Sequence, residues 1–356
     1  MWFAFLGLSG AVLVFWHALE DATYPATIAR PSDAAALPLE ALREKLLVAR
    51  PAADIFRISL PDPPGGAMRL DFFDTRPGTD DVFRGTAFLD PATGALLAER
   101  IFGEAWIHTL YSLHSGLILG RTGIVMAALA GLVLALLPIL GLLLWWHRDG
   151  RSLRESLAPV AGLSGLRRLR NWHRALGLWA TIPLLLASIT GAGLAFPETV
   201  RDLARPILGE PVATRHQGPV TGDLAAAMAR AEELLPGFRS VWIDLPLAGT
   251  KDPTSIILRP VDGRLSGPAV AVLGPALGKQ MEVTLASPVE TLRAWIMGLH
   301  NGVAFGLAHR LFVVALGLAP ITLAVLGWLA WRRRARQRAA AGLTPRMGAR
   351  AGIAAE

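Results

Sequence analysis

The sequence predicts an α+β membrane protein, in which a four-span transmembrane helix bundle of two pseudo-repeats carries two small α+β domains on one side of the membrane. Of the 356 residues, 53% are hydrophobic and only 18% are charged, a balance typical of membrane proteins with sizeable polar parts. The sequence also repeats itself. The pattern Leu-His-x-Gly-x-x-x-Gly begins at Leu113 and returns 186 residues later, at Leu299. This repeat indicates a duplicated chain whose halves share one fold.

Three apolar stretches are long enough to cross a bilayer, which takes about 20 residues of helix. Residues 175–196 form one, and two more follow short interfacial helices within residues 106–146 and 294–331. Residues 1–16 are apolar but short, and they lack the positive leader and the cleavage site of a signal peptide. A weaker repeat matches residues 9–15 with residues 190–196. We therefore interpret residues 1–16 as a first span without its opening turns.

Arginine indicates the orientation of these spans. The loop at residues 147–174 and the tail at residues 332–356 are rich in arginine, and such segments stay on the cytoplasmic side. Residues 17–105 and 197–293 are then expected on the outer side, which in a bacterial envelope is the periplasm. The net charge of +7 follows largely from these arginines, so topology and the lipid bilayer explain it without nucleic acid. The chain has no cysteine, which excludes disulfides, thiolate metal sites and cysteine nucleophiles.

Each of the two long polar segments has the pattern of a helix followed by antiparallel strands. In the first segment, we expect a helix at residues 33–50 and strands at residues 55–60, 68–73, 82–89 and 96–101. In the second, we expect a helix at residues 223–235 and strands at residues 240–245, 255–260 and 269–273. Neither segment contains a nucleophile elbow or a glycine-rich phosphate loop. The chemistry is therefore expected elsewhere.

Histidines at the ends of the spans are the candidates for that chemistry, because an ionisable side chain is costly there and indicates a function. His114 and His300 occupy equivalent positions in the two repeats, and neutral imidazole is a common ligand of haem iron. We expect this pair to hold one haem iron from both sides. The glycines two and six residues further on would leave a flat surface for the porphyrin, with close helix packing as the alternative. These glycines are Gly116, Gly120, Gly302 and Gly306.

A second, inner haem is expected near His173, at the cytoplasmic end of the third span. The repeat puts the counterpart of this histidine ahead of Met1, so His147 is the visible substitute as a second ligand. His108 and His309 are candidates for an alternative outer ligand or a contact to substrate, although solvation at the membrane surface explains them more simply. We expect one or two haems, with the iron bound by His114, His300 and His173.

Together these residues resemble the PepSY-associated transmembrane helix family, over residues 1 to about 334. The resemblance is carried by His114 and the glycines after it, Trp172-His173-Arg174, Thr190-Gly191-Ala192, Leu299-His300 and the turn Asp90-Pro91-Ala92-Thr93-Gly94. It implies iron-regulated, four-span proteins of the bacterial inner membrane with PepSY domains in the periplasm. Some members bind b-type haem and reduce ferric siderophores, whereas PepSY domains elsewhere are linked to peptidase inhibition. The chain departs from the family in its first span, which lacks the usual opening histidine.

The function expected from the sequence is transmembrane electron transfer by a haem-dependent ferric-siderophore reductase. The chain contains no Rossmann fingerprint for a nicotinamide or flavin cofactor, so the electron donor is expected to be a quinol or a separate protein. Two alternatives stay open. One is a non-enzymatic membrane scaffold whose PepSY domains bind a peptide or a peptidase, and the other is a transporter subunit for the iron chelate.

Overall fold

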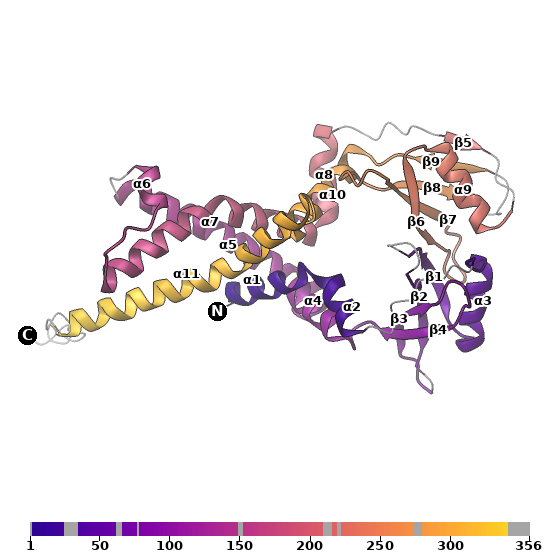
Figure 1. Cartoon of the computed structure of the whole chain (residues 1–356), viewed down its shortest axis with the longest axis horizontal. Helices are drawn as coiled ribbons and strands as arrows, with labels where there is room; N and C mark the ends of the chain where they lie inside the picture. Colours follow the sequence, from indigo (N-terminus) through magenta and orange to yellow (C-terminus); the bar gives the residue numbers. More distant parts are fainter. Residues whose placement is uncertain are drawn as a thin grey trace, which may run out of the picture.

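The computed structural model describes residues 2–24, 35–61, 66–76, 78–148, 152–208, 216–218, 222–273 and 280–340. These residues form an elongated molecule with a helical bundle at one end and a β-sheet region at the other (Figure 1). The two ends correspond to the apolar and polar segments of the sequence. The last part of the expected tail, residues 341–356, lies outside the described residues, as do the first two residues of the helix expected at 33–50.

Three helices are long and apolar enough to cross a membrane, namely α5 (Gly120–Arg148), α7 (Gly165–Ala195) and α11 (Gly306–Ala340). A fourth candidate span is the pair α1 (Trp2–Leu13) and α2 (Trp16–Thr23), which is bent by 67°. Most side chains of α5 and all those of α11 are at least partly exposed, as expected of helices surrounded by lipid. The chain is therefore a multi-pass membrane protein.

The helices of the two halves pack in equivalent ways. Helix α1 lies along α11, and its counterpart α7 lies along α5. At the first of these crossings Gly7 and Gly317 face each other so closely that a Cβ on either glycine would overlap the other's backbone. Small residues at a crossing allow such an approach. The bundle thus has an approximate twofold axis between its halves.

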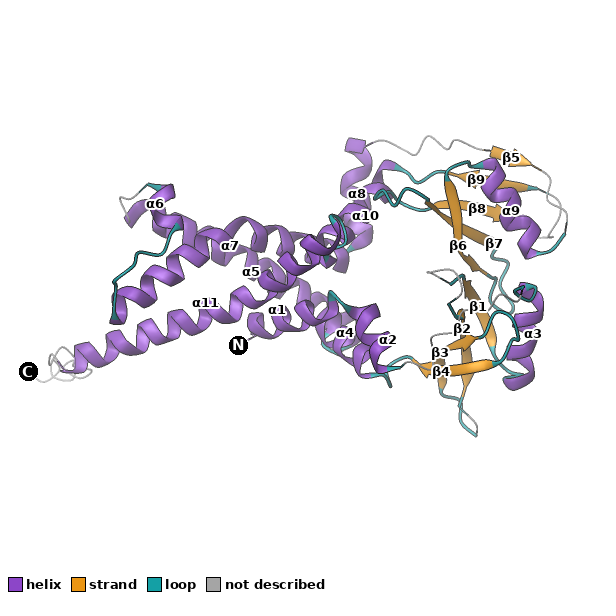
Figure 2. Ribbon diagram, in the orientation of Figure 1, coloured by secondary structure: helices purple, strands orange, loops and turns teal. Residues whose placement is uncertain are grey.

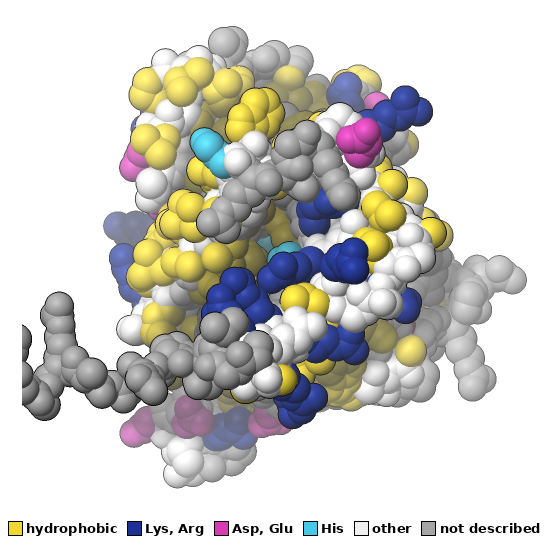
Figure 3. Space-filling view, turned by 90° about the vertical axis from the view of Figure 1, so that its left-hand side faces the viewer, with side chains coloured by type: hydrophobic (Ala, Val, Ile, Leu, Met, Phe, Trp, Pro, Cys, Tyr) yellow, Lys and Arg dark blue, Asp and Glu magenta, His cyan; other side chains and the backbone are white. Residues whose placement is uncertain are grey.

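A short helix precedes each of the two descending spans, α4 (Trp106–Gly116) before α5 and α10 (Pro288–Asn301) before α11. Helix α8 (Pro197–Leu208) follows α7. At the opposite end of the bundle, the small helix α6 (Leu153–Leu157) begins with a capping box formed by Ser152 and Glu155. Figure 3 views this end and shows Lys and Arg side chains gathered around it. The exposed arginines here include Arg167, Arg168, Arg170, Arg332, Arg333 and Arg334.

The strands of both polar segments form one antiparallel sheet of nine strands, in the order β4-β3-β2-β1-β6-β7-β8-β9-β5. The first segment contributes β1 (Asp54–Ser59), β2 (Met68–Thr75), β3 (Val82–Leu89) and β4 (Leu96–Ile101). The second contributes β5 (His216–Gly218), β6 (Phe238–Asp244), β7 (Thr254–Pro260), β8 (Ala269–Leu273) and β9 (Met281–Thr284). Because β1 pairs with β6, the two segments share one sheet.

The main core lies on the face of this sheet that points away from the bundle. Helices α3 (Leu39–Ala49) and α9 (Leu224–Leu234) cover that face (Figure 2). Fully buried side chains from both halves meet there, among them Leu42, Leu46, Ile58, Phe72, Ile243 and Leu258. Burying this apolar area stabilises both helices on the sheet. The other face of the sheet, which α3 and α9 do not cover, points toward the bundle.

Candidate functional site

His114 is held against α1 by the hydroxyl of Ser9. Its Nδ1 lies 3.0 Å from that hydroxyl, which donates its own proton to the carbonyl of Phe5, 2.8 Å away. A hydroxyl has one proton to donate, so it accepts from Nδ1, which carries the proton of the neutral ring, and Nε2 keeps a free lone pair. The ring is thus set up as a ligand through Nε2.

His300 is held against α7 in the same way. Its Nδ1 lies 3.1 Å from the carbonyl of Ala187 and 3.2 Å from the hydroxyl of Thr190. That hydroxyl donates to the carbonyl of Leu186, 2.8 Å away. The Ala187 carbonyl and the Thr190 hydroxyl can thus only accept from Nδ1. The Nδ1 atom therefore carries the proton, and Nε2 of His300 keeps its lone pair.

A glycine lies beside each of these imidazoles. A Cβ on Gly10 would lie 2.9 Å from Cε1 of His114, and a Cβ on Gly191 would lie 2.9 Å from Cε1 of His300. Both distances are too short for a side chain, so each imidazole can approach its helix only at a glycine. The weaker repeat in the sequence matches Ser9-Gly10 with Thr190-Gly191. The two imidazoles therefore pack against equivalent residues of α1 and α7. Sequence analysis found this repeat without assigning its purpose.

The two imidazoles lie next to each other. Their ring centroids are 6.2 Å apart, with an angle of 44° between the ring planes. Two metal–nitrogen bonds of about 2 Å on opposite sides of one ion, with each centroid about 1 Å behind its nitrogen, give a centroid separation of about 6 Å. The spacing of His114 and His300 therefore suits one ion between two axial nitrogens.

Both histidines line a cavity of about 880 Å³. Its walls come from α1, α2, α4, α5, α7, α8, α10 and α11, and they are mostly apolar. Among the described residues, no group of three or more His, Cys, Asp or Glu is placed to hold a metal ion. A bare ion would lack ligands here, whereas a porphyrin brings four nitrogens and leaves two axial positions for histidine. The donor set and the cavity therefore fit a haem.

Charged side chains also reach this cavity. Arg201, Arg293 and Arg310 line it together with Glu290. Glu290 pairs with Arg201 at 3.3 Å and with Arg293 at 3.5 Å. These arginines can neutralise anionic groups of a bound molecule. Sequence analysis missed them, and it also assigned no role to His17, which lines the cavity too.

The four glycines of the repeated motif lie where each short helix meets the long helix after it. Gly116 is the last residue of α4, where a Cβ would lie 3.1 Å from the side chain of Ile124. Gly120, Gly302 and Gly306 have positive φ values of 55°, 81° and 69°. They mark the break between each short helix and the long helix after it, a conformation that favours glycine. None of the four is among the residues that line the cavity.

The two inner histidines lie apart from this site. Nδ1 of His173 is 3.0 Å from the carbonyl of Leu323 in α11, with Gly327 beside the ring. His147 instead bonds to the carbonyl of Leu143 in its own helix, at 2.9 Å. Both histidines are exposed. No hydrogen bond or ring contact within the described part of the chain joins them.

His108 and His309 do not line the cavity. His108 stacks on Phe102 at a centroid distance of 5.0 Å, and its Nε2 lies 3.9 Å from Glu20. Burial lowers the pKa of His108, while the nearby carboxylate of Glu20 raises it. His309 contacts the ring of Phe305. These contacts give each histidine a place in the packing.

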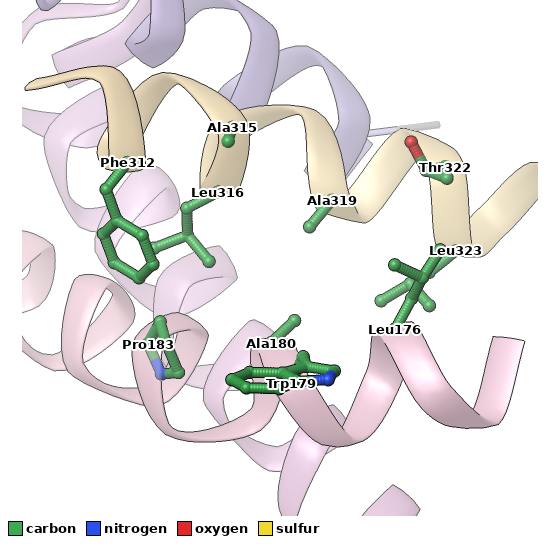
Figure 4. Close-up of a pocket in the computed structure, with 10 residues that line it drawn as sticks. All are labelled: Leu176, Trp179, Ala180, Pro183, Phe312, Ala315, Leu316, Ala319, Thr322 and Leu323. Atoms are coloured by element: carbon green, nitrogen blue, oxygen red, sulfur yellow. The ribbon is translucent and has the colours of Figure 1, made fainter. Parts of the chain in front are cut away.

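A second groove, of about 240 Å³, lies between α7 and α11. Figure 4 shows Trp179 and Pro183 of α7 on one side of it and Phe312 and Leu316 of α11 on the other. The indole nitrogen of Trp179 donates to the carbonyl of Leu157. The groove contains no titratable side chain, so it offers an apolar surface but no acid, base or ligand.

The sequence of the bundle and the sheet region matches a known protein family. The family described as PepSY-associated TM region matches residues 1–334. No curated protein gives a significant match to the chain. Because the family match extends from the first span to the end of the last one, this protein belongs to the PepSY-associated TM region family.

Proposed function

We propose that this protein holds a haem b between His114 and His300, and that it transfers single electrons across the bacterial inner membrane to a ferric siderophore in the periplasm. One observation carries the proposal. Two imidazoles from equivalent positions, each with its Nε2 lone pair free, lie 6.2 Å apart in a cavity of about 880 Å³. A half-buried pair of neutral histidines without further protein ligands is typical of haem ligation.

Haem would supply a one-electron couple between Fe(III) and Fe(II) at this position. The residues around it have separate tasks. The hydroxyl of Ser9 and the carbonyl of Ala187 accept hydrogen bonds from the two Nδ1–H groups, which fixes both rings and strengthens Nε2 as a metal ligand. The apolar walls exclude water. Arg201, Arg293 and Arg310 would neutralise the propionates.

The distribution of arginine supports the proposed direction of transfer. Exposed arginines gather at the end of the bundle remote from the sheet (Figure 3), which by the positive-inside rule is cytoplasmic. The histidine pair is then near the periplasmic end of a four-span bundle, below the sheet region. A quinol or a separate protein donor supplies the electron on the cytoplasmic side, where His173 is the candidate ligand of a second haem. One electron reduces one ferric ion, and the ferrous ion leaves because hard oxygen ligands bind it less tightly.

The test is a reduced-minus-oxidised visible spectrum of the purified protein, with a pyridine haemochrome count per chain. A b-type α-band is expected, and it should disappear in the His114→Ala, His300→Ala double variant. His309→Ala is the matched control. That histidine lies at the beginning of α11, in the helix that follows His300, but it does not line the cavity. Folded protein that shows no such band, although haem was supplied, would exclude electron transfer. A non-enzymatic scaffold would then be the remaining function.

A further inference from the structure

The two halves of the sheet join where β1 pairs with β6, and we name this boundary the seam. The seam lies on the same axis as the histidine pair. Ile58 of β1 pairs directly with Ile243 of β6 in antiparallel register. These two residues are 185 positions apart in the sequence, and His114 and His300 are 186 apart. An antiparallel pair of equivalent strands is related by a twofold axis that runs through the sheet between them. The axis that exchanges the two halves therefore passes between the histidines and through the Ile58–Ile243 pair.

One face of the sheet at this seam looks toward the bundle. Arg100 of β4 is on that face, since its guanidinium contacts Glu20 of α2. Directly paired residues of neighbouring strands share a face, and Arg57 is related to Arg100 through the paired positions Asp71 and Thr86. Arg57 therefore lies on the bundle side, opposite the face that α3 and α9 cover.

Arg57 belongs to a cluster of guanidinium groups around one indole. The guanidinium of Arg57 lies 5.2 Å from the ring of Trp242, and that of Arg259 lies 5.3 Å from it. Trp242 also donates through its indole nitrogen to Asp244, which pairs with Arg57. We name Arg57, Trp242 and Arg259 the seam platform. Cation–π contacts hold its guanidinium planes against the ring.

The charge of the seam platform is only partly balanced. Arg57 has Asp244 as its partner, but no carboxylate within the described residues pairs with the exposed Arg259. The platform therefore favours a negatively charged ligand.

Aromatic rings continue this surface along β1 and β2. Phe56 and Phe73 stack at a centroid distance of 4.9 Å, and the guanidinium of Arg84 lies 5.2 Å from the ring of Phe56. Flat guanidinium and aromatic groups offer faces on which a planar ring can stack. The surface thus combines charge for anionic oxygens with stacking for aryl groups.

We propose that the seam platform binds an anionic ferric chelate whose iron is held by aryl oxygens, of the tris-catecholate class. Such a chelate presents both features that the platform recognises, negative charge and exposed aromatic rings. A trihydroxamate chelate is uncharged around its iron and brings no aryl rings, so it should bind less well. This inference rests on the proposed function for the identity of the metal, and it puts the substrate on the axis that leads to His114 and His300.

The test measures binding without electron transfer. The full-length protein in detergent is titrated calorimetrically with the gallium(III) complex of a tris-catecholate and, separately, of a trihydroxamate. Gallium takes the same oxygen ligands as ferric iron but is not reduced. The catecholate complex should bind more tightly. Arg259→Gln and Trp242→Leu should each weaken it about tenfold, since each removes one charge-assisted or stacking contact, and should leave the trihydroxamate unchanged.

The matched control is Arg230→Gln, which removes the same charge from α9 on the opposite face, where Arg230 pairs with Glu233. It should bind the catecholate complex as the wild type does. Equal affinity of the wild type for both gallium complexes, or unchanged binding in Arg259→Gln and Trp242→Leu, would overturn the proposal. A protein without a haem band that still binds the catecholate complex through the platform would refute the proposed electron transfer and support the binding site.

Discussion

The guanidinium of Arg100 in β4 contacts the carboxylate of Glu20 in α2, and these side chains are only 7% and 11% exposed. The other carboxylate oxygen of Glu20 accepts a hydrogen bond from the indole of Trp16. Arg100 also lies over the rings of Tyr24 and Phe88. This ion pair therefore joins the sheet region to the bend between α1 and α2.

Removing one member of this pair should destabilise the protein strongly. Glu20→Ala removes the carboxylate from the buried charge of Arg100, and breaking a buried ion pair in this way costs about 3–5 kcal/mol in comparable cases. The double variant Glu20→Leu, Arg100→Met removes both charges and should recover most of that loss. The measurement is the free energy of unfolding in detergent. Wild-type stability in Glu20→Ala would mean that the contact does not hold the two regions together.

The stability of the same region should depend on pH through His108. Burial lowers the pKa of this histidine below its ordinary value of 6.5, so the folded protein favours the neutral ring. The stability that the neutral His108 ring contributes is fully present above about pH 6.5. It is lost as the pH falls below that value, because the unfolded chain takes up the proton first. Between about pH 7 and about pH 5, the wild type should lose more thermal stability than His108→Gln. Parallel pH profiles of the two proteins would contradict this.

The glycines behind the histidines should be intolerant of a methyl group. In Gly10→Ala or Gly191→Ala the new Cβ would lie 2.9 Å from an imidazole carbon, so the ring must move away from its helix. We expect less haem per chain, or a shifted α-band, in either variant. Gly141→Ala is the control, since nothing lies within 4 Å of its new Cβ. If all three variants have the wild-type spectrum, the imidazoles do not depend on these glycines.

The crossing of α1 and α11 should be equally sensitive to size. Replacing Gly7 or Gly317 with alanine puts a methyl group into the backbone of the facing helix, and overpacking of this kind costs about 1–3 kcal/mol. The thermal midpoint in detergent should fall in both variants. Gly131→Ala makes the same change at an ordinary contact distance of 3.6 Å and should behave as the wild type. Equal midpoints would show that α1 can shift without loss.

Much of the fold could be predicted from local patterns. The strands expected at 82–89 and 96–101 are found there as β3 and β4, because the turn residues Asp90 to Gly94 between them define where each strand ends and begins. The span helices extend beyond the apolar stretches. Helix α11 continues to Ala340 through its arginines, since a helix need not end where the bilayer does. Helix α8 and strand β9 were missed.

The joining of the two sheets could not be predicted. Local alternation shows that β1 and β6 are strands, but it does not show which edges pair, and this pairing joins residues that are far apart in the sequence. The repeat identified His114 and His300 as equivalent, and the structure brings them together. The positive φ values of Gly120, Gly302 and Gly306 could not be predicted, because a repeated glycine shows only that the position is special and not which backbone angle it takes.

The seam between β1 and β6 also has an evolutionary consequence. Each half offers the same edge strand to the other, which is the geometry of a closed, two-fold symmetric homodimer. Two copies of an ancestral half-length protein could have joined through this strand and met at one histidine each. Fusion into one chain then allowed the two copies to diverge. Arg57 and Trp242 occupy equivalent positions, because each directly precedes one residue of the Ile58–Ile243 pair. Their different side chains are an example of that divergence at the centre of the molecule.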